Sequence, residues 1–95
     1  MPKLAIIGSI EAPSGQRAQL LTALVAHTSR CLNNEPGTLQ MDVLAPREDE
    51  GKLLLYEVYQ DDEAFDEHLK GASIARFREE APWVKVHVTK CALVE

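Results

Sequence analysis

Three side chains that can transfer protons lie close together in the 95-residue sequence, namely Glu57, Tyr59 and His68. Glu57 and Tyr59 are two residues apart on an expected strand, so they share one face of it. His68 falls in the helix that follows, and an imidazole can gain and lose a proton near neutral pH. Burial of Glu57 would raise its pKa and make it a proton acceptor. We therefore predict a catalytic group in which His68 is the base or proton relay and Tyr59 donates to a substrate oxygen.

Each of these residues also has a structural interpretation. His68 could pack against the sheet, Glu57 could form a salt bridge across the sheet or a dimer interface, and Tyr59 could be a strand former with a solvated hydroxyl. No Ser-His-Asp set, phosphate-binding loop or metal cluster stands out in the sequence. Neither Cys31 nor Cys91 lies in a CxxC pattern, so the sequence predicts no metal site.

The elements that must position these side chains follow from apolar spacing and from turn residues. The predicted elements are a strand over 3–10, a helix over 16–32, strands over 38–44 and 53–60, a helix capped by Asp61 and ended by Gly71, a short helix capped by Ser73, and a strand over 83–94. The order βαββαβ, with an extra helical turn before the last strand, predicts an α+β fold of the ferredoxin-like type. The whole chain, residues 1–95, is predicted to be a single domain.

The long helix has a predicted buried face and predicted ends. The apolar positions at helical spacing are Leu20, Leu24, Val25, Thr28, Cys31 and Leu32. Ser14 is the predicted N-cap, and Asn33-Asn34 is predicted to end the helix because Asn tolerates the left-handed conformation. Asn33 is also a candidate for orienting a ligand oxygen. His27 in mid-helix and His87 on the last strand are predicted to be surface or packing residues.

Composition narrows the class of partner. The sequence is 45% hydrophobic and 26% charged, and its net charge is -5, so nucleic acid is not expected because phosphate binding requires clustered Lys and Arg. No apolar run reaches the roughly 18 residues that span a bilayer, so no membrane partner is expected. The N-terminus lacks the pattern of a signal peptide, which predicts the cytoplasm and reduced thiols at both cysteines.

The sheet face away from the helices is expected to be uncovered, although it also carries apolar residues. A large uncovered apolar surface tends to associate with other apolar surfaces. Covering it with the same face of a second chain predicts a symmetric homodimer.

The assembled motifs resemble those of the antibiotic biosynthesis monooxygenase family over nearly the whole chain. The residues that carry the resemblance are Glu35-Pro36-Gly37 before a strand, Tyr56-Glu57-Val58-Tyr59 on the next strand, Asp61-Asp62-Glu63-Ala64-Phe65 at a helix start, His68-Leu69, and Gly71-Ala72-Ser73 before a helix with Phe77. The resemblance implies a ferredoxin-like monomer, a dimeric α+β barrel, and a pocket between sheet and helices. It also implies oxygenation of quinols and other electron-rich aromatics without flavin or metal.

The resemblance leaves the activity open, because the family is functionally mixed. We expect a monooxygenase that uses O2 and no cofactor on a small aromatic or quinol-type substrate. The expected substrate contacts are Asn33, Phe65, Phe77 and Trp83, of which the last two could instead be core residues. The family's heme-degrading branch typically has Trp where this chain has Tyr59, which disfavours heme. The alternatives are a non-catalytic small-molecule-binding stress-response dimer and an isomerase that uses His68 and Glu57 as an acid-base pair.

Overall fold

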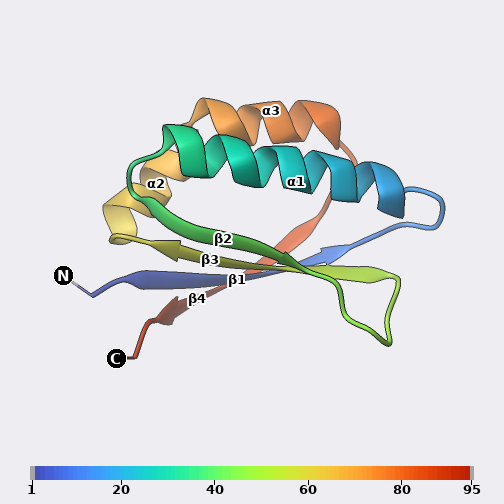
Figure 1. Ribbon diagram of the computed structural model, residues 1–95, viewed down its shortest axis with the longest axis horizontal. Helices are drawn as coiled ribbons and strands as arrows, with labels where there is room; N and C mark the ends of the chain where they lie inside the picture. Colours follow the sequence, from blue (N-terminus) through green and yellow to red (C-terminus); the bar gives the residue numbers. More distant parts are fainter. Residues whose placement is uncertain (1, 95) are drawn as a thin grey trace.

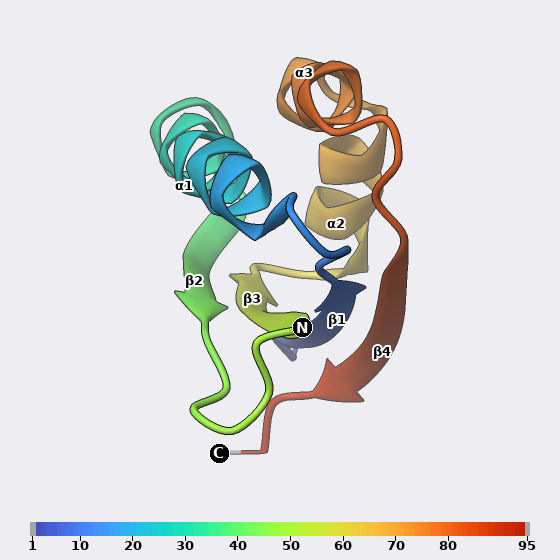
Figure 2. The same ribbon diagram turned by 90° about the vertical axis from the view of Figure 1, so that its right-hand side faces the viewer.

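The computed structural model describes residues 2–94. It has two layers, a four-stranded antiparallel sheet and three helices on one face of that sheet (Figures 1 and 2). The elements in chain order are β1 (Leu4–Glu11), α1 (Arg17–Asn34), β2 (Thr38–Leu44), β3 (Lys52–Tyr59), α2 (Asp62–Lys70), α3 (Ala72–Glu80) and β4 (Val86–Ala92). The strand order in the sheet is β2-β3-β1-β4. The predicted ferredoxin-like α+β fold is confirmed, and the extra helical turn is a complete third helix.

The ends of α1 differ from the prediction. Its N-cap is Gln16, and no side chain caps it, because Gly15 adopts a left-handed conformation (φ 82°) that separates Ser14 from the helix. At the other end Asn33 and Asn34 are the last two helical residues, and the cap is Glu35 in an extended conformation. Ser14 is therefore not a cap, and neither Asn takes the left-handed conformation.

The start and end of α2 are as predicted, and this matters because α2 carries His68. The Asp61 carboxylate accepts a hydrogen bond from the Ala64 backbone N–H at 2.8 Å, which satisfies one of the free donors of the first turn. Gly71 ends α2 and also precedes α3, which has no side-chain cap. The predicted cap Ser73 lies inside α3 and is buried.

The buried face of α1 is rotated relative to the prediction. The structure buries Leu20, Ala23, Leu24, His27 and Cys31 on this face. The predicted positions Val25 and Leu32 are instead 62% and 45% exposed. The apolar pattern overlooked Ala23 and His27, which occupy the helical positions that complete this face.

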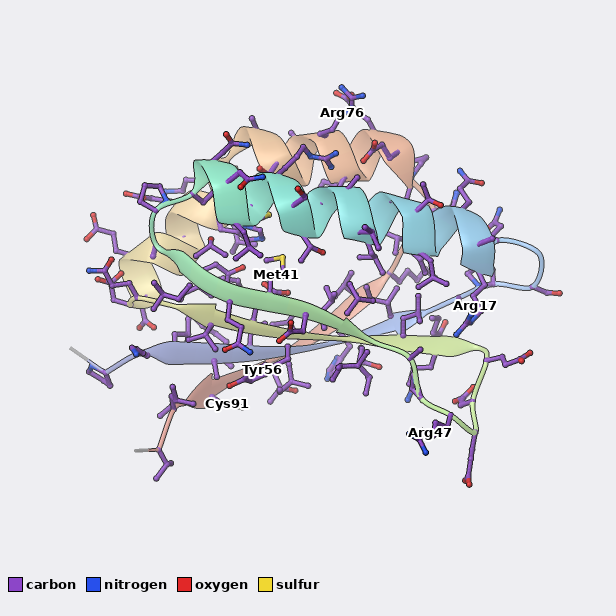
Figure 3. All side chains as sticks on the ribbon, viewed as in Figure 1. Arg17, Met41, Arg47, Tyr56, Arg76 and Cys91 are labelled. Carbon is purple, nitrogen blue, oxygen red and sulfur yellow. The ribbon has the colours of Figure 1, made fainter. Side chains whose placement is uncertain are left out.

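The sheet presents alternate residues to its two faces. Glu57 and Tyr59 face the helices together with Leu55, as predicted, while Tyr56 faces the opposite side. In Figure 3, Met41 lies between sheet and helices, whereas Tyr56 and Cys91 lie on the far side. Among the described residues, no helix is long and apolar enough to cross a membrane.

Candidate functional site

A pocket of about 560 Å³ lies between the sheet and the helices. Its walls are mostly apolar and include Phe65 of α2, Phe77 of α3 and Val88 of β4. The side chains that bring polar groups to it are His27, Glu57, His68 and Arg78. A mostly apolar cavity of this size with a few polar groups is typical of small-molecule sites.

Glu57 lies in the pocket wall and is bonded to Tyr59. The Tyr59 hydroxyl donates a hydrogen bond to Glu57 Oε1. Burial raises the pKa of Glu57, and the bond from Tyr59 opposes this only in part. Burial and the charge of Glu57 also raise the pKa of Tyr59 well above its ordinary value, so its hydroxyl stays protonated and acts as a donor.

Tyr59 itself does not reach the ligand space. Its side chain is fully buried, and it is absent from the pocket wall. Its ring packs against Phe65 and His68, with centroids 5.1 and 5.3 Å away. Tyr59 therefore orients Glu57, and the structure does not place it to donate directly to a substrate as predicted.

His68 is held by Glu35, which the sequence had suggested only as part of a turn. His68 Nδ1 lies 2.8 Å from Glu35 Oε1, and the Thr38 hydroxyl donates to the same oxygen at 2.7 Å. Burial opposes ionisation of Glu35, but the bonds from Thr38 and His68 prevail and lower its pKa. An ionised carboxylate can only accept hydrogen bonds, so His68 donates from Nδ1, and Nε2 is the ring nitrogen left to accept a proton.

Two further buried residues of α1 adjoin His68. His27 is only 4% exposed, and its ring nitrogens lie 3.5 and 3.7 Å from Cys31 Sγ. Cys31 Sγ also lies 3.8 Å from His68 Nδ1. Burial, and then the charge of His68, lower the pKa of His27 to about 4. Burial, and then the charge of Glu35, raise the pKa of Cys31 to about 12, so both side chains are neutral at pH 7.

The remaining predicted contacts divide into two groups. Phe65 and Phe77 line the pocket, where Phe65 stacks on His68 with centroids 6.2 Å apart. Asn33 is exposed on α1 and donates to Ser29 at 3.3 Å. Trp83 packs against the core cluster built around Leu24 and Phe77. Asn33 and Trp83 are not in the pocket wall.

The sequence missed Glu35 and His27, and a signal for both was present. His27, Cys31 and Glu35 follow one another at intervals of four residues, which places them along one side of α1 and its end. That side is the one facing α2 and His68. Polar residues at this spacing on a buried helix face indicate a polar cluster.

Together these features define a small ferredoxin-like α+β domain with an apolar pocket and proton-transfer groups in its wall. The sequence model of the antibiotic biosynthesis monooxygenases matches residues 4–80. This chain therefore belongs to the antibiotic biosynthesis monooxygenase family.

Solved structures share the fold over their full length. The PA3566 protein of Pseudomonas aeruginosa is 24% identical with a TM-score of 0.89, over 100% of this chain and 97% of that one. A putative antibiotic biosynthesis monooxygenase from Nitrosomonas europaea is 17% identical with a TM-score of 0.88, over 97% and 99% of the two chains. A protein from Bacteroides thetaiotaomicron, described as a possible oxidoreductase, is 16% identical with a TM-score of 0.88, over 97% and 98%. A search of curated proteins found no match.

Proposed function

We propose that this protein is a cofactor-independent monooxygenase that oxidises a small phenol or quinol with O2. The observation that carries the proposal is the apolar pocket with His68 and Glu57 in its wall and the ionised Glu35 behind His68. Family membership and neighbours described as a putative monooxygenase or a possible oxidoreductase support the same class of reaction.

The residues suit the first step of such a reaction. His68, which donates to Glu35 from Nδ1, accepts the phenolic proton at Nε2, and Glu35 stabilises the imidazolium that forms. The electron-rich anion then passes one electron to O2, and the two radicals combine to a peroxide on the ring. Loss of water gives the quinone, so that phenol plus O2 yields quinone plus water with no external reductant. The apolar walls limit access of water to these intermediates.

Glu57 is suited to the second proton transfer. Its raised pKa favours the protonated form, and Tyr59 already occupies Oε1. The second carboxyl oxygen can therefore carry a proton toward the developing peroxide. Two carboxyls with opposite pKa shifts thus take different roles, with Glu35 ionised behind the base and Glu57 as the acid.

Oxygen consumption with a panel of quinols and phenols tests this proposal. We expect turnover above the uncatalysed rate and a loss of at least about 100-fold in His68→Ala, the usual scale of general-base removal. His87→Ala is the matched control, because His87 lies on β4 outside the pocket wall. If wild type and His68→Ala are both no faster than the uncatalysed reaction across the panel, the proposal fails.

The same pair of residues supports a second candidate, an isomerase. Glu57 and His68 both line the pocket and could move a proton between two carbons of one substrate. Such an enzyme would exchange substrate protons with solvent and take up no oxygen. A non-catalytic binding protein would instead be stabilised by ligand without any turnover.

The oligomeric state and the cellular location of the protein are also part of the proposal. We propose a homodimer formed through the sheet face that the helices leave open, on which Ile7 and Leu44 are 39% and 48% exposed. The cytoplasm is the proposed location, consistent with two free cysteines.

A further inference from the structure

Two of the three histidines and one of the two cysteines of this chain meet in one buried cluster. His27 and Cys31 lie one turn apart on α1, and His68 reaches them from α2. Their exposed fractions are 4%, 0% and 3%. One donor atom from each lies within 4.8 Å of the others. A loose surface grouping would not show this burial.

The two sulfur–nitrogen separations within the cluster are close to those of a metal coordination shell. A tetrahedral zinc ion with bonds of about 2.3 Å to sulfur and about 2.0–2.1 Å to nitrogen places those two ligands about 3.6 Å apart. Cys31 Sγ lies 3.5 Å from His27 Nε2 and 3.8 Å from His68 Nδ1. Sγ is nearly equidistant from both ring nitrogens of His27, so a modest ring rotation directs one of them to an ion.

Glu35 places a carboxylate beside the cluster. Its Oε1 lies 2.8 Å from His68 Nδ1, so an ion bound at Nδ1 would displace the shared proton and lie near this oxygen. Its Oε2 is buried and has no hydrogen-bond partner among residues 2–94. The carboxylate therefore brings a negative charge to the edge of the cluster.

The charges also balance. On binding the ion, the Cys31 thiol and His68 Nδ1 release their protons to solvent. The resulting thiolate and the nearby Glu35 carboxylate carry two negative charges, which a divalent cation neutralises. Thiolate and imidazole donors favour zinc and related ions over magnesium or calcium. Since His27 and His68 line the pocket, the pocket provides a route for the ion to enter.

We propose that His27, Cys31 and His68 form a binding site for a divalent cation of the zinc class, with the Glu35 carboxylate beside it. The site is argued from the geometry of its donors and not from the oxygenase proposal, although an ion on His68 Nδ1 would displace the hydrogen bond to Glu35 on which that proposal rests. Sequence spacing conceals it, since His68 comes from a different helix than the other donors.

Titration of the metal-free protein with Co²⁺ tests the site, because a cobalt–thiolate bond absorbs strongly in the near ultraviolet. We expect one Co²⁺ per chain, the charge-transfer band, and its loss when Zn²⁺ is added. Cys31→Ser should abolish the band, and His27→Ala should weaken Co²⁺ binding at least tenfold. Cys91→Ser and His87→Ala are matched controls, because they remove the remaining cysteine and histidine outside the cluster, and both should bind as wild type does.

The outcomes separate cleanly. A folded wild-type protein without the charge-transfer band at millimolar Co²⁺ overturns the proposal, whether or not any variant folds. Equal losses in Cys91→Ser and Cys31→Ser also overturn it, since they show non-specific thiol binding. Circular dichroism checks that each variant is folded. If a cluster variant does not fold, the Co²⁺ titration is done on His27→Gln in its place. The cobalt absorption band and the circular dichroism spectrum do not require enzymatic activity. Failure of the metal-site proposal is therefore distinct from failure of the oxygenase assay.

Discussion

At the scale of single residues, the site contains two carboxyls, the buried Glu57 and the partly exposed Glu35, whose surroundings shift their pKa values in opposite directions. Hydrogen bonds from Thr38 and His68 overcome burial and lower the pKa of Glu35. Burial dominates at Glu57 and raises its pKa despite the bond from Tyr59. Glu57 lines the pocket and Glu35 lies behind it on His68, and carboxyls with shifted pKa values beside a cavity are candidates for a functional site.

Glu57→Gln should make the protein more stable at neutral pH and less active. The folded protein holds the Glu57 proton more tightly than the unfolded chain, whose carboxyl has its ordinary pKa of 4.5. The stability of wild type therefore falls as pH rises from 4.5 to the raised folded pKa. Gln keeps the acceptor for Tyr59 and does not titrate, so this fall should disappear.

Thermal unfolding of both proteins between pH 4 and pH 8 measures the effect, where 1 kcal/mol corresponds to roughly 4–8 °C. The melting temperature of the variant should exceed that of wild type at high pH, and the difference should shrink toward pH 4. Glu11→Gln on the exposed side of β1 is the control. A constant difference at every pH would contradict a burial penalty at Glu57.

The sequence could predict Glu57 and His68 because their placement depends on local patterns. Strand alternation puts Glu57 on the helix side, and the Asp61 cap fixes the phase of the helix that carries His68. The four-residue spacing of His27, Cys31 and Glu35 indicates a polar side of α1 and its end, but it does not identify the partner, because His68 lies 33 positions after Glu35. The direct donor role of Tyr59 was not supported. The alternation of side chains along a strand predicts which face of the sheet Tyr59 lies on, but it does not predict how deeply the side chain is buried.

At the scale of elements, helix ends were predictable where one side chain decides them. Asp61 caps α2 as expected, but α1 begins without any side-chain cap. The buried face of α1 was predicted incorrectly because two of its positions are not strongly apolar. Tertiary packing against β2 and α3 decided the orientation of α1, which propensity alone could not.

The approach of β2 to α2 depends on Gly37. A methyl group added at Gly37 would overlap the Ala64 side chain in the first turn of α2, and the Gly37 carbonyl accepts a bond from Gln60 at 2.9 Å. Gly37→Ala must therefore push α2 away from β2. We expect it to destabilise the fold by about 1–3 kcal/mol, the scale of overpacking, as measured by urea unfolding.

Gly51→Ala in the loop between β2 and β3 provides the matched control. There the added methyl would meet only the Asp49 side chain, at 3.3 Å, and an effect within about 0.5 kcal/mol is expected. If the two variants unfold at the same urea concentration, close packing at Gly37 is not what joins β2 to α2.

At the scale of the whole molecule, the helices cover only one face of the sheet (Figure 2). The opposite face carries Ile7 beside its cross-strand partner Tyr56, and Leu44 beside Leu54. Directly paired residues point to the same side, so these apolar side chains form one continuous surface. A 95-residue domain gains proportionally more than a large one from covering such a surface.

A charge placed on this open face should separate the proposed dimer. We expect sedimentation to find a dimer at micromolar concentration for wild type and a monomer for Ile7→Lys, because a dimer interface between copies would bury an unpaired ammonium group. Val25→Lys is the control, since Val25 is 62% exposed on α1 and is equally apolar, and it should remain dimeric. A wild-type monomer would contradict the proposed assembly, while an Ile7→Lys dimer would show that another surface joins the chains.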